Sequence, residues 1–184
     1  KLAAARVDAF TGSIRAETGK PTWDARAEAS LIASKIDITV DESPSSPLSR
    51  VTGGDISLGG TKWGRTQFRP HGVMAVLGPF NFPMHLPNGH IAPALAMGNT
   101  IVFKPSDKTP HCGLVLATLY IEALAKLGAP LGVLNLVQGG PAVATRLAGG
   151  DGVDGVLFTG SWPVGRRIME ANLDRPGRIL ALEM

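Results

Sequence analysis

The stretch that decides the fold is Val73-Met74-Ala75-Val76-Leu77, which continues directly into Gly78-Pro79-Phe80-Asn81-Phe82-Pro83-Met84. An apolar run of five residues bounded by turn-forming residues is typical of a buried β-strand. Similar short runs recur towards the C-terminus. We predict strands at Val73–Leu77, Thr100–Lys104, 133–137, Gly155–Thr159 and Ile179–Glu183.

Helical stretches separate these strands, and we predict helices at 87–97, 110–127, 141–148 and 163–173. Each begins at or near a proline, and Gly98, Gly128 and Gly149 stand just past the ends of three, which is the usual asymmetry of helix termini. Alternating strands and helices build a parallel sheet through right-handed crossovers. The predicted fold class is α/β: a five-stranded parallel Rossmann-like sheet with helices on both faces and ligand sites at the carboxyl ends of its strands.

The region before this sheet has a different composition. Residues 2–38 are rich in Ala, Arg, Glu and Ile and predict two helices, with a break at Gly19-Lys20-Pro21. The Ser/Pro-rich residues 43–47 end the second helix, and 51–68 predict a loop followed by an extended segment. We therefore expect an incomplete N-terminal part at 1–70 and a dinucleotide-binding domain at 71–184.

Composition excludes several functional classes. The chain has 184 residues, of which 44% are hydrophobic, and this is enough for one substantial core. The net charge is +3, but the basic residues are scattered and not interleaved with aromatic ones, so no nucleic-acid partner is expected. No apolar run reaches the ~20 residues of a membrane span. The single cysteine excludes an internal disulfide, which fits a cytoplasmic location. Because Lys1 opens the chain and an apolar, strand-like run ends it, we expect a fragment of a longer protein.

Four segments in order carry a resemblance to a known family: 79–84, the Lys104-Pro105-Ser106-Asp107 turn, Phe158-Thr159-Gly160-Ser161 with Gly165, and Leu180-Ala181-Leu182-Glu183-Met184. In this order they resemble the NAD(P)-dependent aldehyde dehydrogenase superfamily over nearly the whole chain. The resemblance implies NAD as cofactor and a catalytic domain bearing the nucleophilic cysteine downstream of Glu183. That domain is absent from this sequence, so the chain alone is expected to be inactive.

Asn81 is the first candidate catalytic residue. Acyl transfer from an aldehyde passes through a tetrahedral oxyanion, which needs preorganised hydrogen-bond donors. The side-chain amide of Asn81 is such a donor, and Pro79 and Pro83 restrict the backbone that carries it. A simple structural turn is the alternative, because Asn and Pro are ordinary turn residues. The resemblance also places Pro79 and Phe80 among the cofactor-binding residues.

Lys104 and Asp107 follow a predicted strand and can both face the ribose of an adenine dinucleotide, the lysine as donor and the carboxylate as acceptor. A solvated ion pair is the alternative. The family more often has Glu at the place of Asp107.

The resemblance, rather than the glycine spacing, assigns Gly160, Ser161 and Gly165 to the phosphates at a helix N-terminus. Gly139 lines the same region or forms a tight turn.

Glu183 and Cys112 are the other candidates for reaction chemistry. Glu183 ends an apolar strand, where desolvation would raise its pKa and suit it as the general base that activates water. A strand-end glutamate pointing to solvent is the alternative.

Cys112 lies in the first turn of a helix, whose dipole would lower its pKa. The family's nucleophile does not occupy this site, and we interpret Cys112 as a core residue.

Substrate and partner residues are the last group. His85, Asn88 and His90 stand where most aldehyde dehydrogenases have an apolar helix, and they resemble members that act in bacterial arginine catabolism. His85 and Asn88 are candidates for orienting a substrate with two carboxylates. The alternatives are that Asn88 caps a helix and that His90 is a surface residue.

The segment 62–68 resembles part of the family's oligomerisation element, so a homo-oligomer is expected. No metal is expected. A non-catalytic dinucleotide-binding module and an acyl-phosphate reductase relative remain as other functions.

Overall fold

The computed structural model describes residues 1–41, 43, 48–51 and 53–184. The predicted break at 43–47 therefore lies almost wholly outside the described residues. The N-terminal part contains η1 (Ala4–Arg6), α1 (Val7–Thr18), α2 (Thr22–Val40), η2 (Leu48–Val51), β1 (Asp55–Ser57) and β2 (Trp63–Arg65). The remainder runs through β3 (Val73–Leu77), α3 (His85–Ala96), β4 (Thr100–Lys104), α4 (Pro110–Lys126), β5 (Leu134–Leu136), α5 (Pro141–Gly149), β6 (Gly155–Thr159), α6 (Trp162–Glu170) and β7 (Ile179–Glu183).

Five parallel strands form the central sheet in the order β5-β4-β3-β6-β7. The chain first builds outward from β3 to β5 and then returns to the other side of β3 to add β6 and β7. The strand order therefore reverses between β3 and β6. In open α/β sheets the carboxyl ends of the strands at such a reversal form the ligand-binding crevice.

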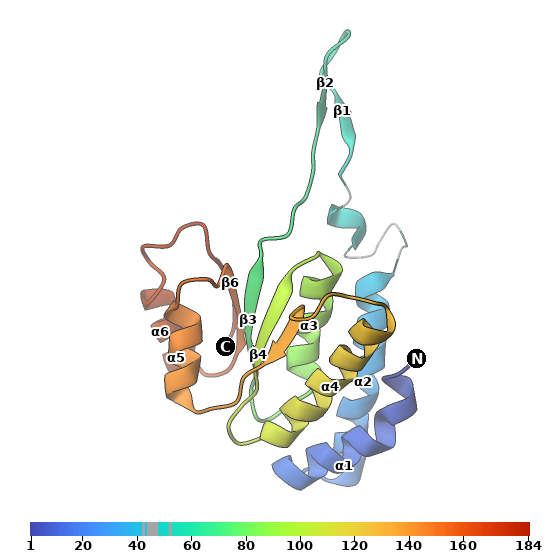
Figure 1. The fold of residues 1–184 in the computed structure, drawn as a ribbon, viewed down its shortest axis with the longest axis vertical. Helices are drawn as coiled ribbons and strands as arrows, with labels where there is room; N and C mark the ends of the chain where they lie inside the picture. Colours follow the sequence, from blue (N-terminus) through green and yellow to red (C-terminus); the bar gives the residue numbers. More distant parts are fainter. Residues whose placement is uncertain (42, 44–47, 52) are drawn as a thin grey trace.

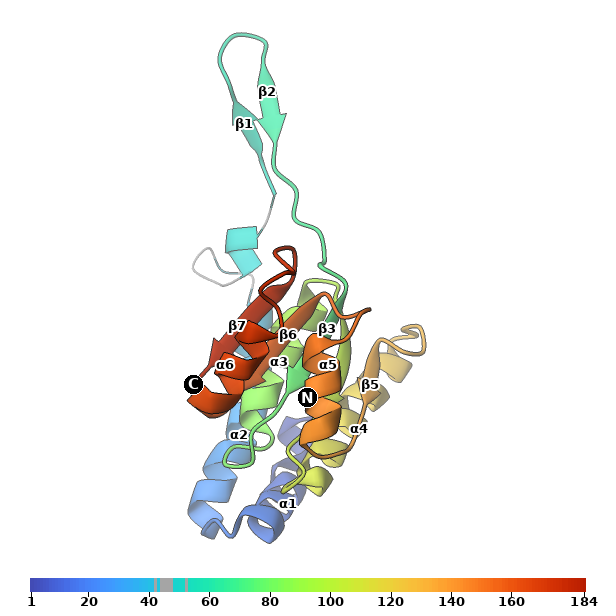
Figure 2. The same cartoon turned by 90° about the vertical axis from the view of Figure 1, so that its left-hand side faces the viewer.

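Side-chain alternation along each strand divides the core into two clusters. Met74 and Val76 of β3 belong to the larger cluster, which joins the sheet to α1, α2, α3 and α4. Ala75 and Leu77 belong to the smaller cluster with α5 and α6. Because successive side chains of a strand point to opposite faces, an apolar strand buries both faces. Figures 1 and 2 show α5 and α6 on one side of the sheet and the other helices opposite.

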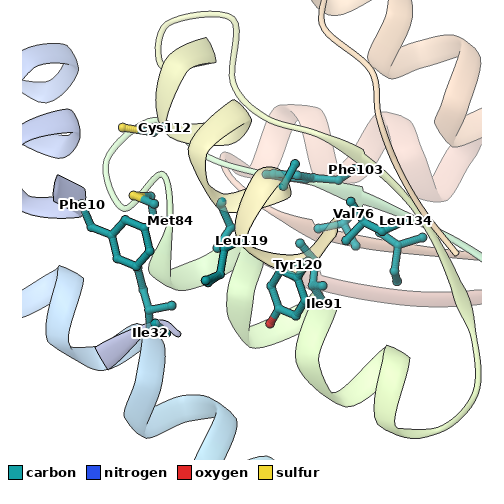
Figure 3. Packing of buried hydrophobic residues seen from close by; sticks show 14 of the residues in the cluster. Phe10, Ile32, Val76, Met84, Ile91, Phe103, Cys112, Leu119, Tyr120 and Leu134 are labelled. Atoms are coloured by element: carbon teal, nitrogen blue, oxygen red, sulfur yellow. The ribbon is translucent and has the colours of Figure 1, made fainter. Parts of the chain in front are cut away.

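Helices α1 and α2 share the core of the sheet. Phe10 and Ile32 are fully buried in the same cluster as Met84 and Cys112, and Figure 3 shows these side chains together. Hydrogen bonds add to this packing. Glu17, near the end of α1, accepts from the backbone N–H groups of His111 at 2.9 Å and Cys112 at 2.7 Å. A side chain of one element thus satisfies donors that the start of α4 leaves open.

The antiparallel hairpin of β1 and β2 projects from the body, as Figures 1 and 2 show. Its apolar side chains are exposed, and they include Ile56, Leu58 and Trp63. An isolated two-stranded hairpin is at best marginally stable in water. No helix among the described residues has the length and apolar character to cross a membrane.

Candidate active site

Asn81 lies in the loop that connects β3 to α3, beyond the carboxyl end of the central strand. Asn81 is exposed, Phe82 is partly buried, and Pro83 and Met84 after them are buried. The peptide of Gly78 fixes the beginning of the loop, because its N–H donates to the carbonyl of Lys104 at 3.0 Å. The loop therefore has anchored ends and presents Asn81 at its surface.

Two lysines cover the aromatic neighbours of Asn81. The Nζ of Lys108 lies 4.6 Å from the centroid of the Phe80 ring, and the Nζ of Lys20 lies 3.6 Å from that of Phe82. Ammonium groups at these distances from a ring face are attracted to it. Lys108 follows β4, whereas Lys20 lies between α1 and α2. Both rings beside Asn81 are thus held by other parts of the chain.

A cleft of about 240 Å³ opens beside this loop, between α5 and α6 at the carboxyl ends of β3, β4 and β6. Among the predicted cofactor residues, Lys104 and Asp107 line it. Several lining residues were not predicted, notably Thr145 and Arg167. The lining consists of Leu77, Gly78, Lys104, Ser106, Asp107, Pro141, Ala144, Thr145, Ala148, Phe158, Val164, Arg167, Ile168 and Ala171.

Lys104 and Asp107 differ in their surroundings. Lys104 is buried, and its Nζ donates to the carbonyl of Pro105 at 2.7 Å. Burial lowers the pKa of Lys104, and the nearby Asp107 carboxylate opposes that shift. Asp107 is exposed at the mouth of the cleft. A donor and an exposed acceptor beside an apolar slot fit the ribose and adenine of a dinucleotide.

The predicted glycines serve backbone geometry and packing. Gly139 has a φ of +151°, a conformation that L side chains rarely adopt, and it leads into Gly140 at the start of α5. A Cβ atom at Gly165 would meet the side chain of Met184, the residue after β7, and that flexible side chain would have to move. Gly160 and Ser161 directly precede α6. Gly139, Gly160, Ser161, Gly165, Pro79 and Phe80 are not among the residues that line the cleft.

Glu183 belongs to a hydrogen-bonded chain that the sequence did not suggest. The Thr159 hydroxyl donates to Oε2 of Glu183 at 3.2 Å, and Nε2 of His90 lies 3.0 Å from the same hydroxyl oxygen. A hydroxyl has one proton, so Thr159 can donate to Glu183 only while its oxygen accepts the N–H of His90. Glu183 is exposed, and the described residues do not supply the desolvation that its position on an apolar strand predicted.

His90 is therefore not the surface residue that the sequence favoured. Burial lowers its pKa, and the Glu183 carboxylate acts in the opposite sense. His90 is partly buried, and Thr159 is buried. One signal for this contact was available in the sequence, because Thr159 is the last residue of a predicted strand. In the β6–β7 register it lies directly opposite Glu183.

The two candidate substrate residues have different positions. Asn88 is fully buried: its Nδ2 donates to the carbonyl of Ile32 at 3.1 Å, and its Oδ1 accepts from the Tyr120 hydroxyl at 2.7 Å. Both ends of its amide are thus used inside the core, which corrects the expectation that Asn88 orients substrate. His85, the first residue of α3, is partly buried. Burial lowers its pKa, with Glu28 as the main opposing charge.

Cys112 is a core residue, as predicted, and is fully buried. The expected effect of the helix dipole is not decisive, because burial and then the hydrogen bond to Glu17 raise the pKa of this thiol far above its usual range. A thiolate at this position is strongly disfavoured. Within the described residues, no group of three or more His, Cys, Asp or Glu side chains is placed to hold a metal ion.

The sheet order and the cleft at its reversal define an α/β protein of the doubly wound class. The model of the aldehyde dehydrogenase family matches residues 1–184. The chain belongs to the aldehyde dehydrogenase family. It is 46% identical over 180 residues to N-succinylglutamate 5-semialdehyde dehydrogenase of Sphingopyxis alaskensis, covering 98% of this chain and 36% of that protein. The protein of the same name from Vibrio cholerae is 44% identical over 187 residues, with 100% and 36% covered.

Solved structures agree with this assignment. The glyceraldehyde-3-phosphate dehydrogenase GapN of Methanocaldococcus jannaschii, complexed with NADP, superposes with a TM-score of 0.88 at 29% identity and covers 99% of this chain and 38% of its own. An NAD-dependent benzaldehyde dehydrogenase from Corynebacterium glutamicum gives 0.86 at 29% identity, with 100% and 38% covered. The chain thus spans little more than a third of the length of the proteins that it matches.

Proposed function

We propose that the full-length protein is an NAD-dependent aldehyde dehydrogenase that oxidises N-succinylglutamate 5-semialdehyde to N-succinylglutamate. The similarity to the two bacterial dehydrogenases of that name supports the substrate. The observation that carries the reaction type is the exposed Asn81 amide on an anchored loop at the switch point of the sheet. An amide held there suits stabilisation of a developing oxyanion.

Different residues of this chain bind the cofactor, stabilise the oxyanion and accept a proton. Lys104 and Asp107 bind the cofactor at the cleft, and the start of α6 after Gly160 and Ser161 faces its phosphates. When bound, NAD accepts the hydride. Asn81 stabilises the oxyanion of the thiohemiacetal, and Glu183 takes a proton from the water that hydrolyses the thioester. Because Cys112 is buried and its thiol pKa is raised, the nucleophile lies outside this chain.

Substrate orientation and assembly complete the proposal. His85 opens α3 next to the Asn81 loop and is assigned to one substrate carboxylate. The exposed apolar hairpin suits a contact between subunits of a homo-oligomer, and a cytoplasmic location fits the single, reduced cysteine. The Asn81 amide and the Glu183 carboxylate act in successive steps, so kinetics can separate them.

Rapid mixing of the full-length enzyme with substrate and NAD tests this division. Asn81→Ala is expected to slow the initial burst of NADH by ~100-fold or more, because an oxyanion donor is lost. Glu183→Gln is expected to preserve the burst and slow the following steady state by ~100-fold, because glutamine cannot accept a proton from water. A normal burst in Asn81→Ala would contradict the oxyanion role. Unchanged steady-state turnover in Glu183→Gln would place the base elsewhere.

A further inference from the structure

An ion pair between the buried Glu28 and the partly buried Lys20 contacts the loop that carries Asn81. The Glu28 side chain on α2 has no exposed surface, and its Oε2 lies 2.8 Å from Nζ of Lys20. Its other oxygen, Oε1, accepts from the backbone N–H groups of Met84 at 3.1 Å and His85 at 3.2 Å. A buried carboxylate is costly unless it is paired and hydrogen-bonded, and here each oxygen has a charged or N–H partner.

The same two residues contact the loop at Phe82 and at the two residues where the loop joins α3. Lys20 places its ammonium 3.6 Å from the centre of the Phe82 ring, one residue after Asn81. Glu28 holds the peptides of Met84 and His85, where α3 begins. The buried side chain of Met84 lies in the core cluster with Phe10 and Ile32, as Figure 3 shows. The carboxyl-terminal half of the loop is therefore tied to α1 and α2, not only to the sheet.

We infer that Lys20 and Glu28 are positioning residues for the reaction: they fix the loop so that the Asn81 amide is preorganised for the oxyanion. This inference rests on the proposed function of Asn81. Donors act on a developing charge only when they need no reorganisation at that moment. A displacement of about 1 Å is enough to cost ~100-fold in rate. Loosening the Lys20–Glu28 contacts is thus expected to lower the rate of the oxyanion step at saturating substrate and leave the KM for the aldehyde nearly unchanged.

The variant Lys20→Met/Glu28→Gln tests this in the full-length enzyme. It removes both charges together, so neither is left unpaired in the interior. We expect the burst rate at saturating substrate and NAD to fall by ~10-fold. In an Asn81→Ala background the same double change should lower the burst by less than ~2-fold, because the group that it positions is gone. Lys20→Arg keeps a cation for Phe82 and Glu28 and is expected to retain most of the rate.

Glu17→Gln is the matched control. Glu17 accepts from two backbone N–H groups at the start of α4, as Glu28 does at α3, but it does not contact the Asn81 loop. It should lower the melting temperature and leave the burst at saturating NAD unchanged. Should the double variant lose its folded near-ultraviolet spectrum, Phe82→Leu tests the ring contact alone, with a slower burst expected.

The outcomes separate this inference from the proposed function. If Asn81→Ala has a normal burst, the oxyanion role of Asn81 fails. If Asn81→Ala is slow but the folded Lys20→Met/Glu28→Gln enzyme, or Phe82→Leu in its place, keeps the parent burst, the positioning role is overturned. Additive losses in the two backgrounds would also overturn it, because they show that the pair does not act through Asn81.

Discussion

At the scale of single residues, we expect Asp107 to decide which dinucleotide the full-length enzyme prefers. Its carboxylate is exposed at the cleft mouth, close to Lys104. A carboxylate accepts a hydrogen bond from a ribose 2′-hydroxyl but repels a 2′-phosphate. Lys104 is already bonded to the carbonyl of Pro105, so it is less free to compensate.

We therefore expect the full-length enzyme to prefer NAD, and Asp107→Asn to raise kcat/KM for NADP relative to NAD by ~10-fold or more. Asparagine keeps the size of the side chain and removes the negative charge. Initial rates with both cofactors measure the ratio. Ser106→Ala, a neighbour on the same cleft wall without charge, serves as the control. An unchanged ratio in Asp107→Asn would show that the carboxylate does not face the ribose.

We expect His85 and His90 to make the stability of the protein depend on pH. Burial lowers the pKa of both below the ordinary 6.5. In the unfolded chain each imidazole takes up a proton near pH 6.5, whereas in the folded protein it does so only at lower pH. The unfolded state thus binds more protons as the pH falls below about 6.5, and the stability that these neutral histidines contribute is lost there.

Urea unfolding at pH 7.5 and pH 5.5 measures this loss. The double variant His85→Gln/His90→Gln is expected to lose less stability between the two pH values than the parent. Glutamine at residue 90 keeps an N–H donor for Thr159. His111→Gln is the control, because the His111 residue is exposed. Equal losses in the parent and the double variant would show that other groups control the acid sensitivity.

At the scale of elements, the strands were the most predictable part. Of the five strands of the central sheet, four have the predicted bounds, and β5 is one residue shorter at each end, although Val133 and Val137 still bond to β4. The hairpin strands β1 and β2 lie in the region predicted as a loop followed by an extended segment. Short apolar runs define strands well because a central strand must bury both faces. The start of α3 was wrong by two residues: the helix begins at His85, so Pro87 lies in the first turn, where its missing N–H is not needed.

The contacts between distant elements could not be predicted from the sequence. Glu17 and Glu28 look like solvent-facing helix residues, yet each meets a helix start far along the chain. Asn88 looked like a polar site residue because a buried amide is recognisable only when its partners, Ile32 and Tyr120, are known. Local patterns place an element, whereas these roles depend on three-dimensional neighbours.

The hairpin gives a prediction at the scale of elements. Trp63 of β2 is 64% exposed, and Ile56 and Leu58 add further apolar surface. Such a ribbon is more stable against a partner than in water. We expect Trp63→Asp to shift the full-length protein towards smaller species in sedimentation velocity. Leu131→Asp, a fully exposed residue in the loop between α4 and β5, should leave the distribution unchanged. If both variants sediment like the parent, the hairpin is not a subunit contact.

At the scale of the whole molecule, the two core clusters divide the sheet unequally. The larger cluster includes α1 and α2, so the N-terminal helices complete one face of the sheet. The catalytic candidates lie at the carboxyl ends of the strands: Asn81 follows β3 and Glu183 ends β7, with β6 between these two strands in the sheet. The predicted boundary at residue 70 separates two parts of the sequence. The hydrophobic core crosses that boundary, because α1 and α2 pack in the same cluster as the sheet.

The projecting hairpin has a topological consequence. The hairpin strands β1 and β2 stand between α2 and β3 along the sequence, yet α2 contacts α3 through Glu28 and the shared core. The contact between α2 and α3 therefore does not depend on the covalent connection through the hairpin. A backbone opened at the hairpin turn would yield two complementary peptides that recognise one another through an existing interior.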